Sequence, residues 1–450
     1  MKTITLFIIL FAGPGAMLAE GLVWTMDDCM RYAVEHSAAV RQKAYAYDTY
    51  GGEQASALAS FLPAVELGSA ARYSFGRAVD PETNTYVNTT TFNNYYEIYA
   101  SMPLFRGGQL VNQWRMAKAN RQMGMNDMLR ERDDLALNTM EAFANAVYYL
   151  GAAGFAAQKR EESLRLLHKA RREEELGLKG KADVAIIEAQ AAADDYLLTR
   201  QENLSNTALL KLKEYMNFPL EDELRVDTAV VISFMPSGES AADIFAYASD
   251  NNPAALEAAF RVRASRMQLL AQRGRLLPSV TLSGGVNTGY FENLKSEAAP
   301  LSFASQMKNN RGEYVGVSVS YPLFDGLSRV TEVRRARNNL RIAVEAESEA
   351  LRKLHTAIEQ SLLDREGYAK ESVQMEKKLM ADSIAYRATS RKYEEGLMSP
   401  LDLQTSANIL LESRANLLKG RLMYLLKCRQ VDYYRGGELI RDNKQTTTNK

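Results

Sequence analysis

Hydrophobic and polar residues follow two different periods along this chain of 450 residues. In four short segments they alternate, which predicts β-strands with one apolar face and one polar face. In the last of these segments, Val315 and Val317 alternate with Gly316 and Ser318. The expected strands cover about 62–75, 93–104, 278–291 and 313–324, and the second fits the alternation least cleanly.

Helical patterns fill most of the remaining chain. Apolar residues recur at three- and four-residue spacing among Ala and long polar side chains, which favours α-helices. At about 1.5 Å per residue, each of the two longest patterns would give a helix roughly 100 Å long. The expected helices cover 24–60, 109–176 and 182–217, and then 241–276, 327–395 and 400–434.

The same order of elements occurs twice. Leu62-Pro63 returns 215 residues later as Leu277-Pro278, and Pro103-Leu104-Phe105 returns 219 residues later as Pro322-Leu323-Phe324. The offset of 219 also relates Gly177 to Gly396 and Asp183 to Asp402. Four landmarks in one order indicate an internal duplication. Because proline ends a helix, we expect helix-strand junctions at Pro63 and Pro278. We expect the other two junctions at Pro103 and Pro322, where the long helical patterns follow.

The duplication sets the expected domain boundaries. The first repeat covers 20–238 and ends in an equatorial segment at 218–238, the second covers 239–435, and a tail follows at 436–450. Residues 1–19 combine an early Lys2, an apolar run and a small-residue end, which is typical of a secretory signal peptide. We therefore expect an exported protein.

Composition narrows the function. The 55 Lys and Arg balance 55 Asp and Glu, which argues against a basic nucleic-acid binder. No nucleophile motif, phosphate loop or metal-ligand cluster appears, so we expect neither catalysis nor a cofactor or metal. The two cysteines, Cys29 and Cys428, fall near the equatorial segment, and a disulfide between them stays open as an alternative to free thiols.

The strands constrain the assembly. Aromatic residues gather at their ends, as in the interfacial girdles of membrane barrels. A transmembrane barrel needs about eight strands, and an open sheet edge in lipid leaves backbone groups unsatisfied. Four strands per chain therefore predict oligomerisation if they span a membrane. Three chains would supply twelve strands and a cylinder of helices below them.

The duplicated plan, with its Leu-Pro and Pro-Leu-Phe junctions and its Gly-x5-Asp turns, resembles the TolC-like outer-membrane efflux protein family over about 22–435. The resemblance implies a mainly α chain with a small β part, which trimerises into a 12-stranded outer-membrane β-barrel and a long α-helical tunnel across the periplasm. It also implies a periplasmic adaptor (membrane fusion) protein, an inner-membrane transporter and outer-membrane lipid as partners. The expected function is passive conduction of exported substrates.

The resemblance also implies a periplasmic gate at the two turns that follow the long helices. The gate residues would be Asp183, Tyr393 and Asp402, and the turns contain Gly177, Gly180, Gly396, Ser399 and Pro400. Met398 and Thr405 stand where the family has an arginine and a carboxylate, so only part of the lock transfers.

Two alternatives stay open. At the second turn, Ser399 as N-cap, Pro400 as first helical residue and Asp402 as third make a good helix start, so Asp402 can cap as well as gate. For the whole chain, the alternative to a duct is an exported, elongated coiled-coil scaffold without a pore. An exported enzyme has no supporting constellation of residues.

Overall fold

A computed structural model describes residues 23–79, 84–229, 238–296 and 300–440. The expected signal peptide, residues 230–237 of the equatorial segment and the tail beyond Ile440 lie outside these residues. The chain divides into two compact units. The first unit comprises the described residues up to Ala38, Arg132–Tyr247 and those from Thr356 onward. The second unit comprises Ala39–Glu131 and Ala248–His355.

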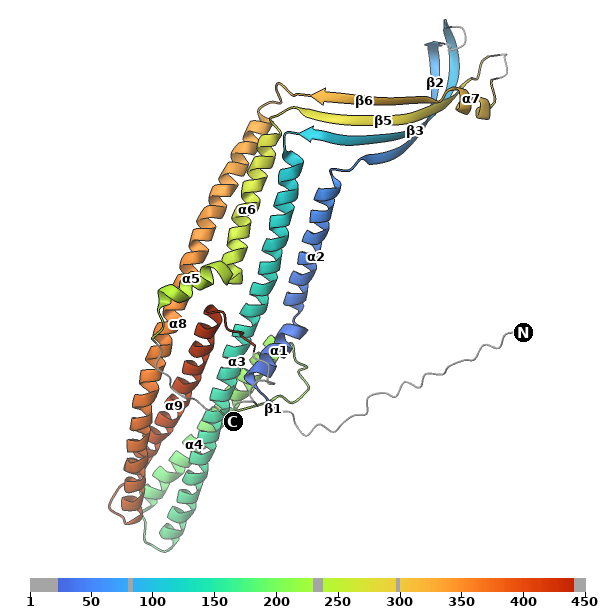
Figure 1. Ribbon diagram of the computed structural model, residues 1–450. Coiled ribbons are helices and arrows are strands. Elements are labelled where there is room, and N and C mark those ends of the chain that lie inside the picture. Colours follow the sequence, from blue (N-terminus) through green and yellow to red (C-terminus); the bar gives the residue numbers. More distant parts are fainter. Residues whose placement is uncertain (1–22, 80–83, 230–237, 297–299, 441–450) are drawn as a thin grey trace, which may run out of the picture. The chain divides into compact units, whose positions relative to one another are not determined.

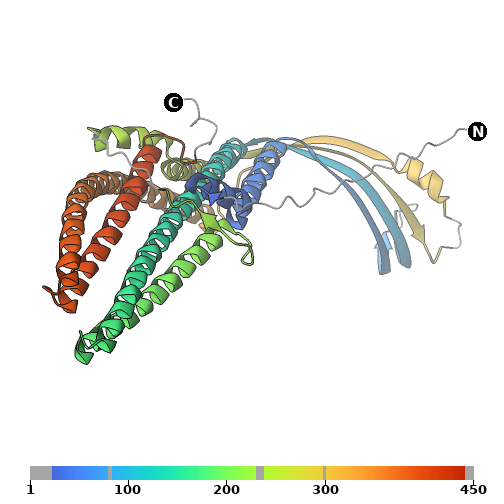
Figure 2. The same ribbon diagram turned by 90° about the horizontal axis from the view of Figure 1, so that it is seen from below.

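The second unit contains a four-stranded antiparallel sheet in the order β2-β3-β5-β6. Its strands are β2 (Ala64–Val79), β3 (Tyr86–Arg106), β5 (Ser279–Asn293) and β6 (Gly312–Ser320). The strands form one curved layer (Figures 1 and 2). The central pair, β3 with β5, joins the first repeat to the second, with Ile98 opposite Val286. Both edge strands, β2 and β6, have one neighbour each among the described residues.

The strand lengths differ from the expected ones. β3 begins at Tyr86 rather than near residue 93, because hydrogen bonds to β2 continue up to the pair of Val79 with Tyr86. β6 is shorter than expected and ends at Ser320 rather than near residue 324. Pro322 lies two residues beyond this end, and proline has no N–H to offer to a sheet.

The leading helix of each repeat, expected to be continuous, is broken. The first repeat has α1 (Met26–His36) and α2 (Ala38–Ala59), and the second has α5 (Ala241–Asn251) and α6 (Pro253–Gly274). The breaks are at Ser37 and Asn252, which are 215 residues apart and share an extended backbone, with ψ of 126° and 131°. A residue before proline avoids the helical region, which explains the break at Asn252.

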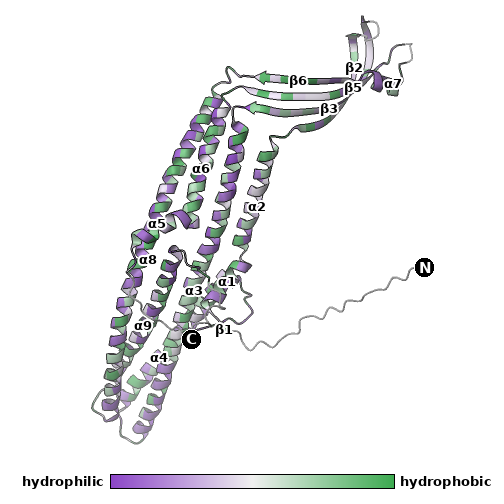
Figure 3. Ribbon diagram, in the orientation of Figure 1, coloured by the Kyte–Doolittle hydropathy of each residue, from purple (hydrophilic) through white to green (hydrophobic). Residues whose placement is uncertain are grey.

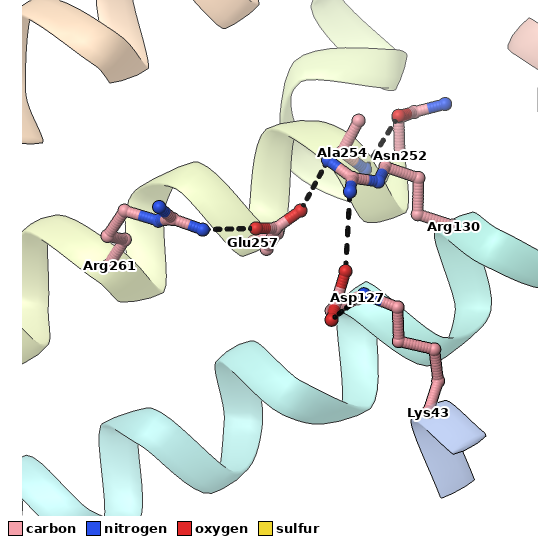
Figure 4. Close-up of polar contacts among 7 residues, drawn as sticks. All are labelled: Lys43, Asp127, Arg130, Asn252, Ala254, Glu257 and Arg261. Atoms are coloured by element: carbon pink, nitrogen blue, oxygen red, sulfur yellow. Dashed lines mark hydrogen bonds and ion pairs between the residues drawn. The ribbon is translucent and has the colours of Figure 1, made fainter. Parts of the chain in front are cut away.

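A network of charges around one buried carboxylate links three helices of the second unit (Figure 4). The Glu257 carboxylate on α6 is buried and forms ion pairs with Arg130 at 2.8 Å and with Arg261 at 2.7 Å. Arg130 lies on α3 (Gln109–Glu175) and also pairs with Asp127 at 3.3 Å. Asp127 in turn accepts from Lys43 on α2 at 2.8 Å. The network compensates the cost of burying the Glu257 charge.

The first unit contains two antiparallel helix pairs (Figures 1 and 2). One pair is the C-terminal part of α3 with α4 (Lys181–Met216), and the other is the C-terminal part of α8 (Ser328–Glu394) with α9 (Pro400–Tyr434). A core packs α1 against α3, α4 and α9, and its fully buried members include Met30, Met140, Leu212 and Leu422. β1 (Val23–Trp24) pairs in parallel with β4 (Arg225–Val226) beside this core.

Hydropathy is mixed along the helices of the chain (Figure 3). Among the described residues, no helix has both the length and the apolar character that crossing a bilayer requires. The mainly α fold with a small β part is as the sequence predicts.

Candidate functional site

The candidate site consists of the two turns of the first unit. α3 and α8 end in the same way, because the backbone N–H of Leu178 bonds to Glu173 O at 2.7 Å and that of Leu397 bonds to Lys392 O at 2.8 Å. The glycine before each leucine has a positive φ, +73° at Gly177 and +77° at Gly396. This Schellman motif favours glycine at that position, since other L-residues rarely adopt a positive φ.

The two returning helices begin differently. Asp402 donates its backbone N–H to Ser399 Oγ at 3.2 Å, and its carboxylate accepts the Ser399 N–H at 3.1 Å. These two bonds form a complete capping box around Pro400, the first residue of the helix. The capping role expected of Ser399, Pro400 and Asp402 is therefore confirmed. Gly180, the N-cap of α4, makes no side-chain cap. The bonds from Ser399 lower the pKa of Asp402.

Tyr393 makes a contact that the sequence did not predict. The Lys179 ammonium donates to the Tyr393 hydroxyl at 2.9 Å and lies 5.1 Å from the centre of its ring. Lys179 also pairs with Glu173 at 3.0 Å. Burial opposes the charge of Lys179, but these bonds outweigh it and raise the pKa of the lysine. The contact links the turn after α3 to the last turn of α8.

Asp183, the third residue of α4, does not make the contact with Tyr393 that the resemblance implies. Its side chain is exposed, and its backbone N–H bonds to Gly180 O at 3.1 Å. Within the described chain, the hydroxyl of Tyr393 bonds to Lys179 and not to Asp183. Met398 is half-buried, and Thr405 bonds back to Leu401 O at 2.9 Å within its own helix.

Further polar contacts join the two helix pairs above the turns. Lys159 on α3 is buried against Asp194 on α4 at 2.8 Å and also reaches Asn408 on α9. Tyr386 on α8 donates to Glu162 on α3 at 2.8 Å, and its burial together with this bond raises its pKa. A cavity of about 420 Å³ lies among them, with Leu166, Ile187 and Leu403 in its lining. The sequence did not single out these residues.

The helix-strand junctions of the second unit are tightly packed. Gly107 has φ +58°, and a Cβ there would lie 2.1 Å from Gly274 O. Only glycine fits this approach between the turn before α3 and the end of α6. Pro103 lies at a register shift within β3. The other three prolines, Pro63, Pro278 and Pro322, lie just before β2, just before β5 and just after β6.

The disulfide left open in the sequence is not formed, because Cys29 and Cys428 are both free. Cys29 is fully buried in the core with Met30 and Leu212, and burial followed by the charge of Asp28 raises its pKa to about 12. Cys428 is half-buried among polar groups, and burial raises its pKa too. In the described part of the chain, no three His, Cys, Asp or Glu side chains are grouped to hold a metal ion.

Part of the chain matches a known protein family. Residues 246–433 match the family model described as outer membrane efflux protein. This match covers most of the second repeat. The TolC-like recognition from the sequence is thereby confirmed, and the location that follows is the outer membrane, extending into the periplasm. No curated protein sequence matches the chain.

Solved structures share the fold over nearly the full length. The outer membrane protein VceC of Vibrio cholerae is similar with a TM-score of 0.78 and 14% identity, covering 92% of this chain and 96% of VceC. The CmeC outer membrane channel of Campylobacter jejuni gives 0.80 and 14%, over 93% and 87%. The MtrE channel of Neisseria gonorrhoeae, described in an open state, gives 0.73 and 17%, over 93% and 90%. The TolC-like fold predicted from the sequence is confirmed.

Proposed function

We propose that three copies of this outer-membrane efflux channel form one duct. The duct passively conducts substrates from a periplasmic adaptor and an inner-membrane transporter to the exterior. It acts as a conduit and not as an enzyme. The observation that carries the proposal is the sheet, whose edge strands β2 and β6 have no second neighbour in the described chain.

One face of this sheet suits lipid. The alternating residues Leu67, Val315 and Val317 lie on it and are 78%, 83% and 61% exposed. The opposite face carries polar residues such as Glu66 and Ser318. A closed barrel would place the apolar face outward and pair every strand edge, which satisfies the backbone in a bilayer.

The contact between the two repeats gives a template for the contact between chains. The repeat offsets make β6 equivalent to β3 and β2 equivalent to β5. Because Ile98 lies opposite Val286, Val317 should lie opposite Ala71 of the partner subunit. The template also explains Gly326, the equivalent of Gly107. Gly326 has a φ of +66° and open space around it, whereas Gly107 contacts Gly274 of its own chain. A partner subunit would take the place of Gly274 at Gly326.

Cysteine cross-linking tests this closure. The double variant Val317→Cys with Ala71→Cys should form covalent trimers on mild oxidation, because the two side chains share a face and a register. Val317→Cys with Ala70→Cys is the matched control, since a one-residue shift turns the second side chain to the other face. Cross-linking of the control but not of the first pair would overturn the register.

Conductance tests the duct itself. The purified protein should fractionate with membranes and open ion-conducting channels in planar bilayers. A soluble protein without conductance would instead support the coiled-coil scaffold.

We further propose that the two turns form the periplasmic gate, with Asp183, Tyr393 and Asp402 as gate residues and Lys179 as an additional one. The Lys179-Tyr393 contact supports this role because it ties one helix pair to the other. Tyr393→Phe, Lys179→Met and Asp183→Ala should each increase single-channel conductance, while Lys377→Met, on an exposed face of α8, should not. Unchanged conductance in all three variants would refute the gate.

The leucines of the turns support docking of the adaptor at the same place. Leu178 and Leu397 follow the glycines of the two Schellman motifs and are 76% and 71% exposed, and Leu176 and Leu401 are exposed beside them. Four exposed leucines on polar helix ends suit an apolar contact with a partner protein.

A further inference from the structure

The short helix α7 (Phe303–Asn309) lies in the connection between β5 and β6. Its Phe303 packs against Tyr290 on β5 and Tyr96 on β3, with ring centres 5.6 and 6.5 Å apart. Tyr290 continues the ring contacts to Phe92, which contacts Tyr73 on β2. These strand residues belong to the same face as Leu67 and Val317, so the Phe303 ring of α7 packs on the apolar face of the sheet. Figure 1 shows α7 beside the end of β5.

Hydrogen bonds fix α7 in this position. β6 stops pairing with β5 at Gly312 opposite Asn287, and beyond it the edge of β5 meets α7. The Gln306 side chain accepts from the Phe291 N–H at 2.9 Å and donates to Phe291 O at 2.8 Å, as a neighbouring strand would. Thr288 Oγ1 donates to Met307 O at 2.8 Å. The helix therefore replaces the missing part of β6.

The docked helix has two distinct sides. Phe303, Gln306 and Met307 share one side by their three- and four-residue spacing, and Gln306 is buried against the sheet. Lys308 lies on the other side and is exposed. Lys295, in the turn after β5, is exposed too. In the part of the chain that the structure describes, neither lysine makes an ion pair.

The described carboxylates of the adjoining strand ends bond to other residues than these two lysines. Glu313 is paired with Arg311, and the Glu292 carboxylate accepts a hydrogen bond from Tyr290 at 2.9 Å. An aromatic girdle marks the level of the headgroups in membrane barrels. The chain of rings from Tyr73 to Phe303 puts α7 at such a girdle.

We propose that α7 is an interfacial helix whose Lys308, with Lys295, binds the phosphate groups of a glycolipid in the outer leaflet. This inference rests on the proposed function, because the apolar face of the sheet must face lipid. Helix α7 is continuous with that face, and the positive charge of its lysine complements a phosphate-bearing surface. A lysine near an anionic lipid surface strengthens binding about fivefold.

Lipid retention tests the proposal. The detergent-purified full-length protein is incubated with bis-phosphorylated lipid A, and the bound lipid is counted by native mass spectrometry. Lys308→Gln should lower the affinity about fivefold, and adding Lys295→Gln should lower it further. The matched control Lys377→Gln, on an exposed face of α8, should bind like the parent. Equal retention by all variants would overturn the proposal.

Two further arms separate the explanations. Lipid A without its phosphates should bind the parent and Lys308→Gln equally, while inorganic phosphate at millimolar concentration should not displace lipid A. Displacement by phosphate alone would show an anion site and not a lipid site, and would overturn the proposal. Each variant is also tested for conductance in planar bilayers. Retained conductance with unchanged lipid binding refutes the inference but leaves the duct intact, whereas lost conductance in the parent refutes the duct.

Discussion

The turn between α3 and α4 and the turn between α8 and α9 stop their first helix alike and start their second helix differently. Both stops are Schellman motifs with a glycine at positive φ, Gly177 or Gly396. The second start has the capping box of Ser399 and Asp402, whereas the first has Gly180 without a side-chain cap. The first turn has instead Lys179, which bonds to Tyr393 of the second repeat.

The difference shows which features of a turn depend on the backbone. A helix stop of this kind needs a positive φ, which strongly favours glycine, so both repeats contain the same residue type. A helix start needs only acceptors for its first N–H groups, and water can supply them. The first turn is therefore free to use its side chains for a contact outside its own hairpin, and Lys179 makes that contact.

The largest local effect is expected from the shared stops. Gly177→Ala and Gly396→Ala should each weaken their turn by about 1–2 kcal/mol, because an L-residue is strained at positive φ. Open space surrounds both glycines, so the cost comes from the backbone alone. The Leu178 and Leu397 amides should exchange hydrogen about 5 to 30 times faster in mass-spectrometric measurements.

A glycine within α3 provides the control for this experiment. Gly154 has equally open space but a helical backbone, so Gly154→Ala should slow local exchange, since alanine favours the helix by about 1 kcal/mol. Effects of very different size at the two stops would contradict their equivalence.

The N-terminal ends of α4 and α9 should respond unequally to substitution of their N-cap residues. Ser399→Ala removes the acceptor of the Asp402 N–H and should cost about 1 kcal/mol, which is about fivefold in exchange of that amide. Gly180→Ala should change exchange in the first turn of α4 only slightly, because Gly180 caps with no side chain and its φ of −79° suits alanine. Gly180→Ser should slow exchange there if it installs the missing cap. Equal losses for Ser399→Ala and Gly180→Ala would refute the asymmetry.

Local signals made much of this architecture predictable. Proline, glycine and alternating residues mark the helix ends and strands, and the duplicated Pro-Leu-Phe motif reveals the repeat. Ser399, Pro400 and Asp402 lie within one helical turn, so their capping could be read directly from the sequence. Pro253 also carried a signal for the break after Asn252, whereas no proline or glycine marks the equivalent break at Ser37.

Contacts between distant segments could not be predicted in this way. Lys179 and Tyr393 are 214 residues apart, and their hydrogen bond depends on how two helix pairs pack and not on any local pattern. The same holds for Lys159 with Asn408 and for Arg130 with Glu257. Helix α7 was missed because seven residues are too short for a reliable helical period, and its position depends on the bonds of Gln306 to β5.

The smallest expected effect concerns the charge within the second start. The hydrogen bonds from Ser399 lower the pKa of Asp402, so its carboxylate adds stability above the pKa of the unfolded chain, about 3.9. That stability is lost as the pH falls through the lower pKa of the folded state. Asp402→Asn should therefore reduce protection of the first turn of α9 at about pH 6, and the difference from the parent should shrink as the pH falls below about 3.9, after correction for intrinsic exchange. A difference of the same size at pH 6 and at pH 3 would refute the assignment to the Asp402 carboxylate.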